Sequence, residues 1–132
     1  MDAITKALIE LNKIGNKERA EDRETERLKT AAEGLGGQGY GGEPHGGNAD
    51  RMADATAKLI EHRAKVKAAR RERFKRKTDA FKIVWSNLDG GAAFVALSVA
   101  YEGKNFKDIS DAAGMSERWA YMQMEQLERD LK

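Results

Sequence analysis

Near the C-terminus, five side chains follow one another at spacings that suit the reading of base edges. They are Ser116, Glu117, Arg118, Tyr121 and Met122. Residues three and four apart share a helix face, so Arg118, Tyr121 and Met122 are expected to point the same way. An arginine on such a face can bind guanine through two hydrogen bonds. The chemistry that this spacing offers is therefore recognition of double-stranded DNA, with Arg118 as the main candidate for a base contact.

Two amphipathic segments position these side chains. The first follows Asn105, a good N-cap, and ends at Gly114, which can adopt the left-handed conformation. Ser116 can cap a second helix over 117–131, and Met115 is expected to fill the space between the two. The inner face of that second helix repeats at helical spacing through Ala120, Met124, Leu127 and Leu131. The short link predicts a helix-turn-helix, whose second helix enters the major groove.

Basic residues are concentrated before this helix pair. Residues 58–82 contain eleven basic and three acidic side chains, whereas residues 103–132 contain five basic and six acidic ones. Neutralisation of phosphates supplies most non-specific affinity for DNA, so the basic helix 58–82 is expected to hold the backbone. The candidate phosphate contacts are Lys104, Lys107, Arg63, Lys67, Arg70, Arg71 and Lys77. A solvated helix face remains the alternative reading of the basic run.

Four segments are expected along the chain, all helical or irregular. Residues 1–33 form an N-terminal helix that Gly15 and Asn16 weaken, and residues 34–49 form a flexible glycine-rich loop, since eight of residues 34–47 are glycine. A long basic helix over 50–88 precedes a DNA-binding domain over 89–132. The fold class is thus all-α: a long antiparallel helical hairpin, coiled-coil-like, plus the helix-turn-helix. Pairing with a second copy, as a homodimer, is the alternative to a hairpin within one chain.

The long helix carries an apolar stripe with alternating spacings of three and four, typical of a heptad seam. It runs through Met52, Ala55, Leu59, His62, Val66 and Ala69. The pattern then continues in a shifted register through Phe74, Thr78, Phe81, Trp85 and Leu88. The two tryptophans, at 85 and 119, are expected to pack in the core or at its edge.

Other chemistry is not expected. Two overlapping G-x-G-x-x-G matches at 34–39 and 37–42 lie in low-complexity sequence, and no strand precedes them. His45 and His62 lack further ligands at metal spacing, and the chain has no cysteine. We therefore expect no enzyme activity, no cofactor and no metal site. No apolar run approaches the ~20 residues of a membrane span, so no membrane association is expected.

The stretch from Lys104 to Ser116 resembles region 4 of sigma factors. It is also similar to phage-encoded late-gene regulators of the ArpU and RinA type, and this wider resemblance covers residues 50–132. The resemblance implies an all-α fold, DNA binding, transcriptional control of phage or prophage genes, and the cytoplasm of a bacterial host. Carried over by position, it implies that Ser116, Glu117, Arg118, Tyr121 and Met122 face the DNA. Two alternatives stay open: a protein-interaction module that docks on RNA polymerase, and a phage packaging protein resembling a small terminase subunit.

Overall fold

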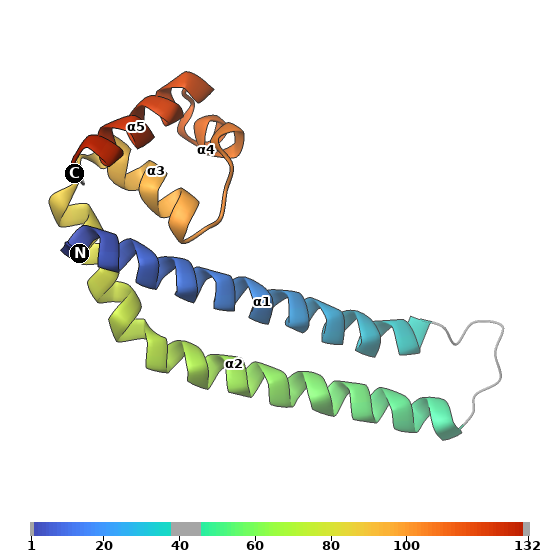
Figure 1. The fold of residues 1–132 in the computed structure, drawn as a ribbon. Helices are drawn as coiled ribbons and strands as arrows, with labels where there is room; N and C mark the ends of the chain where they lie inside the picture. The colour runs from blue at the N-terminus through green and yellow to red at the C-terminus, as the bar shows by residue number, and fades with distance from the viewer. Residues whose placement is uncertain (1, 38–45, 131–132) are drawn as a thin grey trace. The chain divides into compact units, whose positions relative to one another are not determined.

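The computed structural model describes residues 2–37 and 46–130, and within these ranges the chain forms five helices and no strand. The helices are α1 (Ala3–Gly37), α2 (Gly46–Asn87), α3 (Gly90–Ala100), α4 (Phe106–Ala113) and α5 (Glu117–Asp130) (Figure 1). The all-α class expected from the sequence is confirmed for this part of the chain. The helices form two compact units. The two-helix unit is Glu18–Glu72, and the five-helix unit combines Met1–Lys17 with Arg73–Lys132.

In the two-helix unit, the second half of α1 runs antiparallel to the first half of α2. Glu21 pairs with Arg70 and Thr25 pairs with His62, so the partner's number falls as the number on α1 rises. Among the residues of this unit whose burial the structure describes, the buried apolar side chains are Leu28 and Leu59. Hydrogen bonds and ion pairs also join the two helices, as at Arg70 and His62.

In the five-helix unit, the start of α1 and the end of α2 pack against α3. Six buried residues form this core: Ala7, Leu11, Ala80, Val84, Ala93 and Leu97. Three of the six are alanines, with Ala7 on α1, Ala80 on α2 and Ala93 on α3. A hydrogen bond from Asn12 Nδ2 to the carbonyl of Ala100 (3.1 Å) and the edge-to-face contact of Phe81 with Tyr101 (5.1 Å between centroids) join the three helices further.

The helices extend into the segment that was expected to be a loop over 34–49. Helix α1 continues to Gly37 and α2 begins at Gly46, while 38–45 lies outside the described residues. Glycine costs about 1 kcal/mol relative to alanine in a helix, but adding residues to an existing helix avoids the cost of nucleation. The weak point expected at Gly15 is also absent. Helix α1 runs through Gly15 without a break, and Gly15 is buried.

The shifted register expected for α2 is wrong at Phe74 and Trp85, although Phe81 and Leu88 from the same register are half-buried and pack against the core. The side chain of Phe74 is 63% exposed and that of Trp85 is 51% exposed, whereas Arg73 is only 6% exposed. The inner face of α2 continues from Leu59 through His62, Val66 and Ala69 to Arg73, without a skip. The aliphatic stem of a long cationic side chain can occupy a core position, which a search for apolar residues does not detect.

Candidate nucleic-acid interface

The C-terminal helix pair is built from three local caps. The side chain of Asn105 accepts a hydrogen bond from the amide of Asp108 (2.8 Å) at the start of α4. Gly114 ends α4 with φ 69° and ψ 27°, in the left-handed region. The hydroxyl of Ser116 accepts a hydrogen bond from the amide of Trp119 (3.3 Å) at the start of α5. These three residues hold the direction in which α5 leaves α4, and all three roles were predicted from the sequence.

The inner face of α5 packs on both α3 and α4. Ala120 and Leu127 on α5 and Ile109 on α4 are buried. Trp119 and Gln123 of α5 lie against Gly91 of α3. A Cβ added at Gly91 would sit only 2.9 Å from the amide oxygen of Gln123, so the contact at this point is tight. This packing fixes which face of α5 is free.

The free face of α5 carries the residues proposed to read bases. Glu117, Arg118, Tyr121 and Met122 are exposed, and so is Ser116 in the turn. One side of the Tyr121 ring packs against the ring of Phe106 on α4, with 4.3 Å between the ring centroids. The sequence did not predict this aromatic contact, although both residues were assigned to their helices. Met115 was expected to fill the space between the helices, but it is 48% exposed.

A hollow of about 440 Å³ lies beside this face, at the start of α4. Its lining includes Val99, Tyr121, Glu117 and the stretch Lys104–Lys107. Lys104 forms an exposed ion pair with Glu102 (2.9 Å). Lys107 is exposed and forms no ion pair with the described residues. Of the two lysines predicted to contact phosphate here, Lys107 is thus the one free to do so.

Within the two-helix unit, three of the predicted phosphate contacts form a row on α2. Arg63, Lys67 and Arg71 repeat every four residues and are exposed. None of them has an ion-pair partner in the part of the chain that the structure describes. The neighbouring Lys58 and Lys65 differ, since they pair along the helix with Asp54 and Glu61 (both 3.1 Å).

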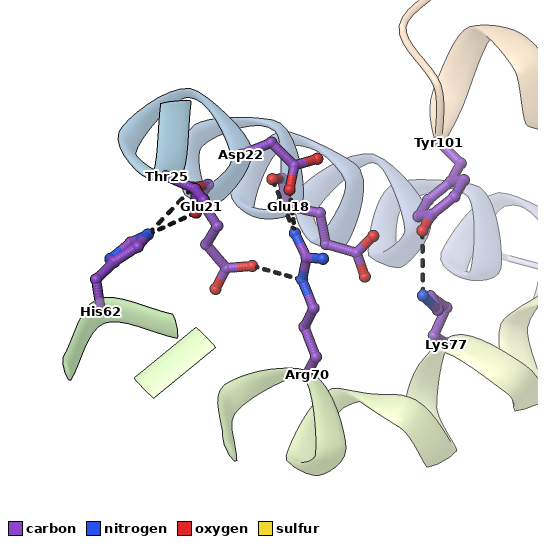
Figure 2. A network of polar contacts seen from close by, with 8 residues as sticks. All are labelled: Glu18, Glu21, Asp22, Thr25, His62, Arg70, Lys77 and Tyr101. Atoms are coloured by element: carbon purple, nitrogen blue, oxygen red, sulfur yellow. Dashed lines mark hydrogen bonds and ion pairs between the residues drawn. The ribbon is translucent and has the colours of Figure 1, made fainter. Parts of the chain in front are cut away.

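Arg70 occupies a different environment although it precedes Arg71 directly. Its guanidinium contacts Glu21 Oε1 (3.2 Å), Asp22 Oδ1 (2.8 Å) and the backbone carbonyl of Glu18 (3.2 Å) (Figure 2). The hydrogen bond to Asp22 is the main cause that raises the pKa of Arg70, while partial burial opposes it. The structure therefore places Arg70 in the contact between α1 and α2, where its Nε and Nη2 groups already donate to α1.

His62 extends the same network toward the other end of the two-helix unit. Its Nε2 lies 2.9 Å from the hydroxyl of Thr25 and 3.2 Å from the carbonyl of Glu21 (Figure 2). A proton on Nε2 can be donated to either oxygen, so this one ring nitrogen links His62 to two residues of α1.

Lys77, in the five-helix unit, is also engaged inside the chain. Its ammonium donates to the hydroxyl of Tyr101 (3.1 Å) and lies 5.4 Å from the centroid of that ring (Figure 2). Lys77 is half-buried by this contact. Two of the seven predicted phosphate contacts, Arg70 and Lys77, thus stabilise the packing of helices.

The described residues contain no group of three histidine, cysteine or acidic side chains close enough to hold a metal ion. None of the helices within 2–37 and 46–130 has an apolar stretch long enough to cross a bilayer. Comparisons of the chain with protein-family models, with curated proteins and with solved structures found no match.

Proposed function

We propose that this protein binds double-stranded DNA through α4 and α5 as a helix-turn-helix, and that it is a transcriptional regulator of phage or prophage type. The observation that carries the proposal is the free face of α5. Its inner residues Ala120 and Leu127 are buried, while Arg118, Tyr121 and Met122 project outward just after a three-residue turn. A helix that is packed on one face and held by a tight turn on its N-terminal side can enter a major groove.

In this proposal each part of the interface has a distinct role. Arg118 reads a guanine, a bidentate contact worth about 1–3 kcal/mol of discrimination. Lys107, at the start of α4, contacts a phosphate, which the exposed amides of a helix N-terminus also favour. The row Arg63, Lys67 and Arg71 supplies further phosphate contacts from the two-helix unit, whose helix pair we take to be a coiled-coil-like hairpin.

Selection of binding sites from random duplex DNA, followed by gel shifts over a range of salt, tests the proposal. We expect Arg118→Ala to relax sequence preference at one position of the site. We expect Lys67→Ala with Arg71→Ala to weaken all sequences equally and to reduce the slope of log K against log salt by about 0.9 for each phosphate that is no longer neutralised. The matched control is Lys58→Ala with Lys65→Ala, which removes the same charge from cations that are already paired. Absence of salt-sensitive binding to any duplex would refute the proposal.

A second candidate function is docking on RNA polymerase. The turn and the free face of α5 expose Met115, Tyr121 and Met122, each about half accessible. Exposed apolar side chains that lie close together are typical of protein interfaces. Acidic side chains also outnumber basic ones in 103–132. Co-purification with polymerase that Tyr121→Ala abolishes, together with no DNA selection, would favour this function.

A further inference from the structure

Helix α2 carries a second apolar row in the five-helix unit, separate from the row that packs on α1. Phe74, Thr78, Phe81 and Trp85 follow one another at spacings of four, three and four residues, and we name this row the outer seam. The inner row of the same stretch contains Ala80 and Val84, which lie in the core with Leu11 of α1. Alternating spacings of three and four are the signature of contact with another helix.

The outer seam is open at both of its ends. The side chain of Phe74 is 63% exposed and that of Trp85 is 51% exposed, and Thr78 and Phe81 between them are half-buried. Phe81 contacts the ring of Tyr101 and packs against the core, so the chain itself covers part of the middle of the seam. Phenylalanine and tryptophan each bury roughly 150–250 Å² when they are fully covered, so covering this seam would be strongly favourable.

Charge beside the seam indicates what covers it. Lys75 and Lys82 are seven residues apart, so they occupy the same heptad position, each directly after an aromatic residue of the seam. Both are exposed, and neither forms an ion pair with the residues that the structure describes. Charges at the positions flanking a seam set the choice and orientation of the partner helix.

A second copy of this chain does not fit these charges. In an antiparallel pair of outer seams, the flanking position of each helix faces its own equivalent, so Lys75 and Lys82 would meet lysines. In a parallel pair, Lys82 of one copy faces the position directly before Thr78 on the other copy, and Lys77 occupies that position. Either arrangement brings like charges together, which is destabilising.

We propose that the outer seam docks an amphipathic α-helix of a partner protein, with acidic residues on both flanks of that helix's apolar stripe. This surface lies on α2, apart from the face of α5 proposed to bind DNA, and the inference does not depend on DNA binding. The apolar stripe covers Phe74 and Trp85, and the acidic flank pairs with Lys75 and Lys82.

Titration of the full chain with two synthetic helices tests this proposal. Both peptides have three heptads with leucine along the stripe; one has glutamate at all flanking positions and the other has lysine. Uniform charge keeps each peptide from pairing with itself. The protein used in the titration has the substitution Trp119→Phe, which leaves Trp85 as its single tryptophan. The fluorescence of Trp85 then reports on the outer seam. We expect the glutamate peptide to shift Trp85 emission to the blue in a saturable way, at least tenfold more tightly than the lysine peptide.

Charge reversal provides the sharpest outcome, because it predicts a gain of binding. Lys75→Glu with Lys82→Glu should reverse the preference in favour of the lysine peptide, whereas Lys58→Glu with Lys65→Glu should leave it unchanged. Equal binding of the two peptides, or no shift of Trp85, overturns the proposal. So does a dimer that Trp85→Glu converts to a monomer, which would make a second copy the occupant. Binding of single-stranded DNA that Phe74→Ala abolishes, without binding of the glutamate peptide, also overturns it in favour of nucleic acid.

Discussion

Alanine substitution of Arg70 and of Arg71, two adjacent arginines, should have opposite consequences. Arg70 makes three contacts with α1, and its side chain is 37% exposed. The partner Glu21 is largely covered (17% exposed), whereas Asp22 is open to solvent (68% exposed). An exposed ion pair contributes only ~0.2–1 kcal/mol, while a hydrogen bond to a charged group away from water contributes ~1.5–3 kcal/mol. After allowance for solvent screening, we expect Arg70→Ala to lower the free energy of unfolding by about 2 kcal/mol.

Arg71 has no such partners among the described residues and lies on the exposed side of α2. Its replacement by alanine should change stability by less than about 0.5 kcal/mol, as is usual for exposed positions. If Arg71 contacts a phosphate as proposed, the salt slope of DNA binding should fall by about 0.9. Arg70→Ala should leave that slope unchanged under conditions in which the protein remains folded.

The two halves of this prediction use different assays. Urea unfolding followed by circular dichroism gives the stability change, and a double-mutant cycle with Glu21→Ala isolates the contact that Arg70 makes across the helices. Gel shifts over a range of salt give the slope. The reasoning is refuted if Arg70→Ala leaves stability intact and reduces the salt slope, because Arg70 would then face DNA and not α1.

Three further predictions concern local structure. Gly114→Ala should cost about 1–2 kcal/mol of stability because Gly114 has φ 69°. Gly90→Ala should stabilise by up to about 1 kcal/mol, since no atom lies within 4 Å of the added Cβ. Thermal unfolding of both variants checks this contrast. Asn105→Ala should cost about 1 kcal/mol by removing the cap of α4, and Asn105→Asp should restore most of it. The amide of Thr5 donates a hydrogen bond to the carboxylate of Asp2 at the start of α1, which lowers the pKa of Asp2. This hydrogen bond is fully formed above the ordinary pKa of 3.8 and is lost as pH falls through the lowered pKa. The NMR chemical shift of the Thr5 amide should follow that loss, and a shift that does not change with pH would contradict the prediction.

The sequence predicted the C-terminal helix pair well because its signals are local. Asn105, Gly114 and Ser116 act within one turn of the helices that they begin or end, so their roles do not depend on the rest of the fold. The predicted inner face of α5 is likewise confirmed at Ala120 and Leu127. DNA contact itself remains a prediction, since it depends on a partner that the sequence does not contain.

The prediction for α2 failed where packing depends on residues far away along the chain. Phe74 and Trp85 are large apolar side chains at helical spacing from Phe81, so a search for periodicity assigns them to the core. The structure instead buries Arg73, Ala80 and Val84, and the last two lie in one core with residues of α1 and α3. One helix can carry two seams, and the sequence alone does not say which one the chain itself covers.

The same limit explains the basic residues of α2. Only the position of α1 separates Arg70, which contacts Glu21 and Asp22, from the adjacent Arg71, which contacts neither. Acidic residues on α1 in the range 18–26 could have suggested a partner for some of these cations. No rule of spacing identifies which cation pairs across two helices, because that depends on their register.

If the proposed function holds, the charges on α5 imply that different residues supply affinity for DNA and selectivity for its sequence. Exposed Glu117, Glu125 and Glu128 outnumber Arg118 and Arg129 on this helix, so α5 as a whole gains little from phosphate neutralisation. Lys104 is paired with Glu102, which leaves Lys107 as the main cation beside the groove-facing helix. Tight binding near physiological salt therefore needs cations outside α4 and α5, and the row of Arg63, Lys67 and Arg71 is one source that the structure offers. Removing that row should weaken every sequence alike, whereas changing Arg118 should alter which sequence is preferred.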